Sequence, residues 1–212
     1  MIDLYTWHTP NGRKVSIMLE EIGMDYKVFP INIAKDEQFQ QHFLNISPNN
    51  RIPAIIDKDN NNFSLFESGA ILMYLAEKSG KLINKSNSDE YFRTIEWLMW
   101  QMGGVGPMFG QVHHFVKYNK GKSDYAEERY SKEARRLYGV MDKRLNNNQY
   151  ISGKEYSIAD ISIWPWTARF DWQEIDLNEF PNVARWYKEM IDRPAVKKGW
   201  LVPQNDQVIP SI

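Results

Sequence analysis

The sequence predicts an α/β domain followed by an all-helical domain, and three observations support this. Residues 1–80 alternate short runs of β-forming residues with segments of helical periodicity. Residues 81–89 are mostly polar and are expected to form a linker. From residue 90 to residue 212 the apolar spacing is helical, and seven of the eight tryptophans lie beyond the linker. We therefore expect two domains, 1–80 and 90–212.

The first domain has the element order β-α-β-α-β-β-α, which predicts a small mixed sheet with helices packed on it. A strand over residues 2–5 precedes a helix over 11–23, in which apolar residues have helical spacing and Gly23 is the C-cap. A second strand over 26–33 is followed by a weak polar helix or turn over 36–45.

The rest of this domain is expected to be a hairpin and a helix. A strand over 52–57, with a proline near its start, is joined through a run of Asp and Asn to a strand over 63–66. A helix over 68–78 follows, capped by Ser68 and closed by Gly80.

The second domain contains a helix whose start is marked clearly. Its longest periodic segments are residues 90–101 and 124–145. Ser157 and Asp160 have the spacing of a capping box ahead of an apolar run. We interpret Asp160 as a folding residue that starts a buried helix and not as a catalyst.

The composition excludes several classes of function. Its 26 basic and 27 acidic side chains give a net charge of −1, so no overall field would hold nucleic acid or an anionic membrane. No stretch approaches the roughly 20 apolar residues that span a bilayer. The chain has no cysteine, which removes disulfides and a cysteine nucleophile of its own. No secretory signal is visible, so we expect a cytoplasmic protein without nucleic-acid or membrane partners.

Thr9, Pro10 and Asn11 join the first strand to the first helix. Proline suits the first helical turn, and the N–H groups and dipole of a helix start favour an anion. The Thr9 hydroxyl and the Asn11 amide could also donate to it. The alternative is an ordinary N-cap without a ligand.

Arg51, Ile52 and Pro53 enter the third strand. A proline there is confined to an edge, a bulge or a cis bond. A cis bond would leave the Ile52 backbone to pair with an extended peptide-like ligand. The alternative is a trans proline that starts an edge strand.

Glu67 and Ser68 lie where the fourth strand turns into the third helix. The carboxylate could take the ammonium of an amino-acid head group, and the helix start could take its α-carboxylate. The alternative is a helix cap with an acidic neighbour.

Residues 101–110 contain four glycines and a proline, which should kink or break a helix. Met108, Phe109 and Trp166 could line an apolar substrate pocket there, although the same residues also fit an ordinary core. The adjacent His113 and His114 point in different directions on a helix and cannot chelate one metal, so no metal is expected.

The order of these features resembles the cytosolic glutathione transferases, over essentially the whole chain. The segments that carry the resemblance are residues 9–11, 47–54, 65–71 and 156–160. Residues 100–108 and 110–115 look like the bacterial Nu class, whose members are described as glutathione-dependent disulfide-bond oxidoreductases. The resemblance implies a thioredoxin-like first domain, glutathione as co-substrate and a homodimer.

The resemblance also implies a glutathione-binding set, which is Asn11, Gln38, Arg51, Ile52, Pro53, Glu67, Ser68 and Arg129. In that set Glu67 and Ser68 match positions that hold the γ-glutamyl head. The backbone of Ile52, before an expected cis-Pro53, matches the position that pairs with the cysteinyl part.

The resemblance also implies roles for the other residues of this set. Gln38 and Arg51 match glycyl-end and polar contacts, and Arg129 matches an arginine that serves its own site or the partner's. Thr9 and Asn11 match residues beside the sulfur and are the expected catalytic residues. Many members of the family use Tyr, Ser or Cys instead; Tyr5 lies inside the first strand and is expected to pack.

Three functions follow as hypotheses. In the favoured one, a glutathione thiolate, stabilised at the start of the first helix, attacks a disulfide, and one or two glutathiones, reduced or oxidised, occupy the site. The second is a conventional transferase that conjugates glutathione to electrophiles. The third is a binding or regulatory protein with little catalysis.

Overall fold

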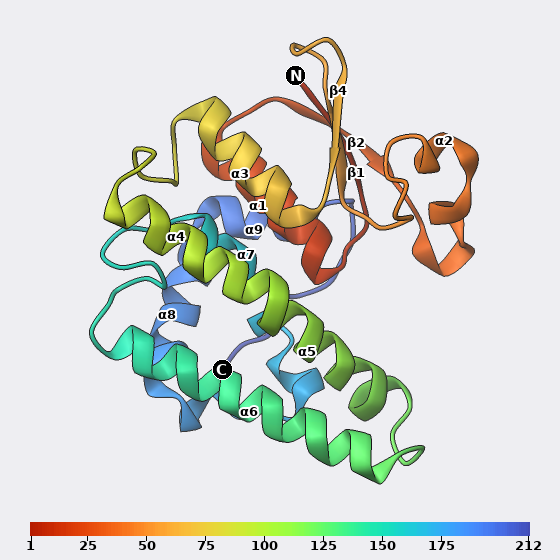
Figure 1. The fold of residues 1–212 in the computed structure, drawn as a ribbon. Helices are drawn as coiled ribbons and strands as arrows, with labels where there is room; N and C mark the ends of the chain where they lie inside the picture. Colours follow the sequence, from red (N-terminus) through yellow and green to blue (C-terminus); the bar gives the residue numbers. More distant parts are fainter. The chain divides into compact units, whose positions relative to one another are not determined.

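The computed structural model describes all residues from Met1 to Ile212. The contacts divide the chain into two compact units (Figure 1). The first unit comprises Met1–Ile83 and Asp192–Ile209, and the second comprises Asn84–Ile191 and Pro210–Ile212. The first unit is thus discontinuous in sequence.

The first unit is built on a mixed sheet. Its strands are β1 (Ile2–Thr6), β2 (Tyr26–Pro30), β3 (Ala54–Asp57) and β4 (Phe63–Phe66), in the order β2-β1-β3-β4. β1 and β2 are parallel, and β3 is antiparallel to both β1 and β4. The four predicted strands are confirmed. β3 is shorter than expected, since Pro53 has no N–H to give to a ladder and pairing starts after it.

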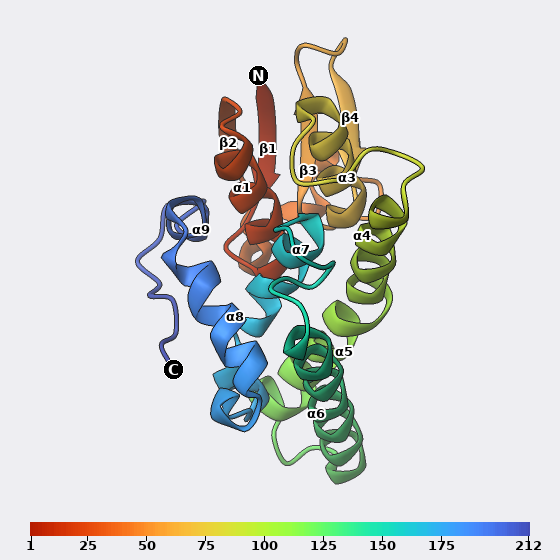
Figure 2. The same cartoon turned by 90° about the vertical axis from the view of Figure 1, so that its left-hand side faces the viewer.

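Helices cover both faces of this sheet. They are α1 (Pro10–Ile22), α2 (Gln41–Leu44) and α3 (Ser68–Ser79), with 3-10 turns at Ile33–Lys35 and Glu37–Phe39. α1 and α3 lie side by side on one face, and α2 lies on the other (Figures 1 and 2). On the α2 side, Tyr5 packs against a buried cluster and stacks on Phe29 with ring centroids 4.8 Å apart, as its packing role predicts.

A helix from the end of the chain completes the first unit. α9 (Pro194–Trp200) packs along α1. A Cβ on Gly199 would lie 2.6 Å from Cα of Ile17, so the crossing requires a glycine. The predicted division assigns residues 192–209 to the helical domain, whereas here they pack with the sheet-bearing unit. Helical periodicity identifies an apolar face but not the element that buries it.

Arg13 ties the C-terminal tail to α1. Its buried guanidinium lies over the Trp200 ring, 3.4 Å from the centroid. Arg13 Nη2 donates to Gln207 Oε1 at 2.9 Å, and Trp200 Nε1 donates to the Gln207 carbonyl at 2.7 Å. The tail is therefore an integral part of the first unit.

The second unit is all-helical. Its α-helices are α4 (Asp89–Trp100), α5 (Gly106–Val112), α6 (Asp124–Asn146), α7 (Ile158–Thr167) and α8 (Pro181–Asp192), with 3-10 turns at Phe170–Gln173 and Leu177–Glu179. Every residue of α7 is buried, so this helix forms the centre of the unit. No helix of the chain has the length and apolar character to cross a membrane.

The glycine-rich segment does not break its helix. α4 passes through a π-helical stretch, Gln101–Val105, into α5, and a second π-helical stretch, His113–Tyr118, follows. Helical dihedrals persist at Gly106. Proline has no N–H to donate to the carbonyl four residues earlier. The π-helical turn accommodates it because the hydrogen-bond pattern changes there.

The capping box at the start of α7 is present as predicted. Ser157 and Asp160 cap each other's backbone. The fully buried Asp160 carboxylate also accepts from Ile151 N and Trp186 Nε1, both at 2.9 Å. Burial raises the pKa of Asp160 to about 6, and these donors oppose that rise by stabilising the charged form.

His113 makes the second unit sensitive to acid. Burial, reinforced by the charge of Arg169, lowers the pKa of His113 from 6.5 to about 4. The unfolded chain therefore binds a proton between these pH values that the folded protein does not. The contribution of His113 to the free energy of unfolding should therefore fall by up to ~3 kcal/mol as pH decreases through this window, while the raised pKa of Asp160 contributes with the opposite sign over nearly the same range.

Urea denaturation at several pH values measures this effect. His113→Phe keeps an aromatic ring against Trp166, whose ring centroid lies 5.5 Å from that of His113. Its free energy of unfolding should fall less, or rise more, on acidification than that of wild type, because only the His113 contribution is removed. His114→Phe, at an exposed neighbouring position, should retain the wild-type slope. Equal slopes for wild type and His113→Phe would contradict the assignment.

Candidate active site

Three predicted site segments lie at one end of the sheet in the first unit. The register pairs Ala54 of β3 with Tyr5 of β1 on one side and with Phe66 of β4 on the other. The chain therefore leaves β1, enters β3 and leaves β4 at the same end. The segments gathered there are residues 7–11, 52–53 and 67–68.

Thr9 is the N-cap of α1. Its backbone is extended, and its Oγ1 accepts a hydrogen bond from Gly12 N at 3.2 Å. Pro10 is the first helical residue, and Asn11, in the first turn, is partly exposed. Thr9 is thus an N-cap, which is the structural role considered for it above. A hydroxyl that accepts one hydrogen bond can still donate another, so capping and ligand binding are compatible.

Gly12 fixes the position of this helix start. A Cβ at residue 12 would lie 2.1 Å from the Trp7 carbonyl oxygen and 2.5 Å from Thr6 Oγ1. Gly12→Ala should therefore displace the first turn of α1 and destabilise the protein by about 1–3 kcal/mol. Gly139→Ala is the control, because open space surrounds that position in α6; it should raise stability by about 0.5–1 kcal/mol. Urea denaturation compares the two, and equal effects would contradict the steric argument.

Ile52 presents its backbone just before β3. The Ile52–Pro53 bond is cis, one of the two forms considered above. Pairing with β1 and β4 begins only at Ala54, and the Ile52 N–H and C=O make no hydrogen bond within the chain. The half-buried Ile52 therefore offers one donor and one acceptor to an extended ligand.

Glu67 and Ser68 form the turn into α3. Glu67 has φ 73° and ψ 114°, a conformation that side chains other than glycine rarely adopt. Its side chain is exposed and caps nothing, and the buried Ser68 is the first helical residue. The predicted Ser68 cap is therefore wrong, since the N-cap position belongs to Glu67.

Lys14 lies beneath this turn and was not found from the sequence. It is buried in α1, and its Nζ donates to Ser68 Oγ at 3.2 Å. Burial lowers the pKa of Lys14 to about 7, and the charge of Glu67 partly opposes this. Lys14 precedes Met18 by four residues and so lies on the apolar face of α1, which was the sequence signal that it is buried.

Gln38 and Arg51 differ in their surroundings. Gln38 is buried, with Nε2 3.4 Å from Asp36 Oδ1, and its Oε1 has no hydrogen-bond partner. Buried polar atoms rarely lack a partner, which fits a group that binds a ligand. Arg51 is exposed, and its carbonyl accepts from Ser47 Oγ at 2.8 Å.

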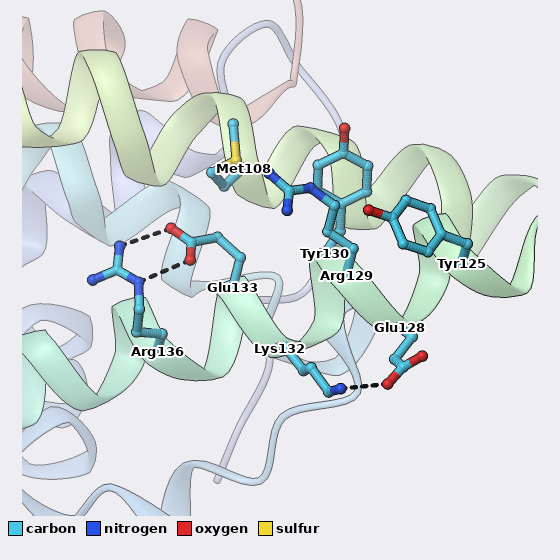
Figure 3. Close-up of a pocket in the computed structure, with 8 residues that line it drawn as sticks. All are labelled: Met108, Tyr125, Glu128, Arg129, Tyr130, Lys132, Glu133 and Arg136. Atoms are coloured by element: carbon cyan, nitrogen blue, oxygen red, sulfur yellow. Dashed lines mark hydrogen bonds and ion pairs between the residues drawn. The ribbon is translucent and has the colours of Figure 1, made fainter.

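The second unit contains a separate groove of about 540 Å³ between α5 and α6 (Figure 3). Its lining residues are Met108, Tyr125, Glu128, Arg129, Tyr130, Lys132, Glu133 and Arg136. Arg136 pairs with Glu133 at 2.7 Å, and Lys132 pairs with Glu128. Arg129 extends from α6 toward Met108 in Figure 3. The groove therefore brings together two residues predicted separately, Met108 and Arg129.

The other two residues of the expected substrate pocket lie in the core. Phe109 is fully buried and stacks on Tyr138 with ring centroids 5.0 Å apart. Trp166 is buried against Gly110, whose lack of a side chain allows the indole ring to approach closely. Of the three predicted pocket residues, only Met108 reaches the groove, because Phe109 and Trp166 follow the packing alternative.

The order of strands and helices in the first unit defines a thioredoxin-like fold, to which an all-helical unit is added. Comparison with known proteins identifies the family. The model described as "Glutathione S-transferase, N-terminal domain" matches residues 1–77, and the corresponding C-terminal domain matches residues 102–194. The chain belongs to the glutathione S-transferase family.

Individual relatives span nearly the whole chain. It is 47% identical over 208 residues to "Disulfide-bond oxidoreductase YfcG" of Escherichia coli, covering 96% of each protein. It is 39% identical to "Disulfide-bond oxidoreductase YghU" of the same organism, covering 98% of this chain and 78% of that one.

Solved structures agree in fold. A glutathione transferase family member from Pseudomonas fluorescens, with two glutathione bound, has 45% identity and a TM-score of 0.89, covering 94% of this chain and 92% of that one. A glutathione transferase from Pseudomonas putida, with one glutathione disulfide bound per subunit, has 43% identity and a TM-score of 0.89, covering 95% and 91%.

Proposed function

We propose that this protein is a glutathione-dependent disulfide-bond reductase whose reactive thiolate lies at the start of α1. The observation that carries the proposal is the convergence of the Thr9 cap, the unpaired Ile52 backbone and the Glu67–Ser68 turn at one sheet end. The names of the two Escherichia coli relatives and the glutathione ligands of the solved structures support it.

In this proposal each segment binds one part of glutathione. Glu67 and Ser68 hold the γ-glutamyl head, and the Ile52 backbone pairs with the cysteinyl residue. Gln38 and Arg51 contact the glycyl end. Four of these five residues offer a matching group: Glu67 a carboxylate, Ser68 the first turn of a helix, Ile52 an unpaired backbone before β3, and Gln38 an unsatisfied amide oxygen.

The sulfur then lies beside Thr9 and Asn11. Hydrogen-bond donors and the positive end of the α1 dipole favour the thiolate, and such surroundings lower a thiol pKa from its usual ~8.5. The thiolate attacks one sulfur of the substrate disulfide, forming a mixed disulfide and releasing the other sulfur as a thiolate, which takes a proton.

A second glutathione thiolate completes the reaction. It attacks the glutathione sulfur of the mixed disulfide, which yields glutathione disulfide and releases the second substrate thiol. Two glutathiones are oxidised and one substrate disulfide is reduced, so no cysteine of the protein takes part, in agreement with a chain that has none. Arg129 remains a predicted glutathione contact, and the groove that holds it also contains Met108.

A comparison of two substrates tests the proposal. Purified protein is assayed with glutathione against a small disulfide and, separately, against a chloronitrobenzene. High turnover of the disulfide alone supports reduction, and high turnover of the aryl halide alone would replace the proposal with conjugation. Turnover of neither, with calorimetric binding of glutathione, would indicate a binding protein.

We further propose that the protein forms a homodimer. Phe92 and Met99 lie seven residues apart on α4, with 58% and 48% of their surfaces exposed. Helical residues at this spacing share a face, and exposed apolar faces are commonly covered by a partner. Light scattering after gel filtration measures the mass, and a monomer near 25.0 kDa would contradict the proposal.

A further inference from the structure

Lys14 stands out because a buried ammonium is costly and no catalytic step described above uses it. Its side chain is 1% exposed, and its Nζ lies 3.2 Å from Ser68 Oγ. Charged groups are rarely buried without a compensating function or partner. Burial lowers the pKa of Lys14 to about 7, and the adjoining Glu67 carboxylate partly opposes this by favouring the charged form.

The hydrogen bond has a direction. An ammonium can only donate, so Ser68 Oγ is the acceptor in the contact with Lys14. A hydroxyl that accepts from a cation becomes a stronger donor through its own hydrogen, because hydrogen bonds in a chain polarise one another. Ser68 is also the first residue of α3, where the helix dipole already favours an anion.

The charges around this turn are complementary to a zwitterion. Glu67 alone would make the end of the site negative and would favour a simple amine. In its protonated form, which the Glu67 carboxylate favours, Lys14 supplies the balancing positive charge from the buried side, next to the hydroxyl and the helix start. One negative and one positive group then face the two charged groups of an amino-acid head.

We propose that Lys14 is a positioning residue that makes the Glu67–Ser68 turn selective for a ligand carrying an α-carboxylate beside its α-ammonium. This inference rests on the proposed function, since the head group concerned is that of the γ-glutamyl residue. Lys14 acts through Ser68 and through its charge, and it need not touch the ligand.

The test compares two ligands by calorimetry. The first is glutathione, and the second is γ-aminobutyryl-cysteinyl-glycine, which lacks only the α-carboxylate. In Lys14→Met the affinity for glutathione should fall about tenfold, because its α-carboxylate loses a nearby positive charge and a polarised hydroxyl donor. The affinity for the decarboxylated analogue should change less than about threefold. Lys58→Met, an exposed lysine of the same unit, should change neither affinity.

Folding is followed separately by thermal denaturation. Methionine matches the length of the buried lysine stem and removes the desolvation cost, so Lys14→Met should be at least as stable as wild type. Should that variant not fold, Lys14→Gln removes the charge while keeping a donor toward Ser68, and the same selective loss is expected.

The outcomes separate the two proposals. Suppose that the wild type binds glutathione. If Lys14→Met then loses equal affinity for both ligands, or keeps its affinity for glutathione, the role of Lys14 is overturned and the proposed function remains intact. Absence of glutathione binding by the wild type at millimolar concentrations would overturn both.

Discussion

Asn11→Ala and Thr9→Val are each expected to lower kcat for disulfide reduction about 10- to 100-fold, while KM for glutathione changes less than about threefold. Each replacement removes a donor beside the proposed position of the sulfur, and a hydrogen bond to a charged group contributes ~1.5–3 kcal/mol. Each ~1.4 kcal/mol corresponds to a factor of ten in rate. Steady-state kinetics with a small disulfide gives both parameters.

The thiolate itself provides a second measurement. Titration of the ultraviolet absorbance of bound glutathione should show a higher thiol pKa in both variants than in wild type. Thr9→Ser is the matched control because it keeps the hydroxyl and the cap on Gly12 N, and its kinetics should stay close to wild type. Wild-type rates in both Asn11→Ala and Thr9→Val would remove these residues from the chemistry.

Asp160→Ala is expected to destabilise the second unit by about 3–5 kcal/mol, the largest stability effect predicted for this chain. The carboxylate satisfies the backbone N–H groups of Ile151 and Ser157, the Ser157 hydroxyl and the Trp186 indole. Its removal leaves these donors buried without an acceptor, and the cost of unpaired buried groups exceeds the gain from making the bonds. Urea denaturation followed by tryptophan fluorescence measures the loss.

Asp176→Ala gives a control for the loss of an ordinary cap. Asp176 also caps a turn, accepting from Asn178 N at 2.9 Å, but it is exposed, so water can replace it. Its replacement should cost about 1 kcal/mol or less. A comparably small loss of stability in Asp160→Ala would contradict the structural role of that carboxylate. Under conditions in which both variants are folded, glutathione turnover is not expected to change in either of them.

Local sequence patterns were sufficient for most of the fold. The short runs of β-forming residues, the Gly23 C-cap and the Ser157–Asp160 box each involve residues close in sequence, and the predicted strands, cap and box are all present. The packing of α9 against α1 could not be derived in this way, because nothing near Gly199 encodes that its lack of a side chain serves a contact with Ile17.

The site was predictable to the extent that its residues mark turns. Thr9, Pro53 and Glu67 each interrupt a regular element, and the sheet register explains why they converge. Lys14 was missed because a lysine within an amphipathic helix ordinarily points to water. For Phe109 and Trp166 the sequence leaves a substrate pocket and an ordinary core both open, because it does not distinguish an aromatic ring that lines a cavity from one that fills the core.

The joining of α9 to α1 bears on how this polypeptide is made. During translation, residue 83 is added more than a hundred codons before Gly199, so the sheet of the first unit is synthesised long before the helix that covers α1. A gene fragment that ends at residue 83 would leave uncovered the side of α1 on which Ile17 meets Gly199. For the same reason, a fusion partner is better attached after Ile212 through a spacer than spliced in place of the closing residues.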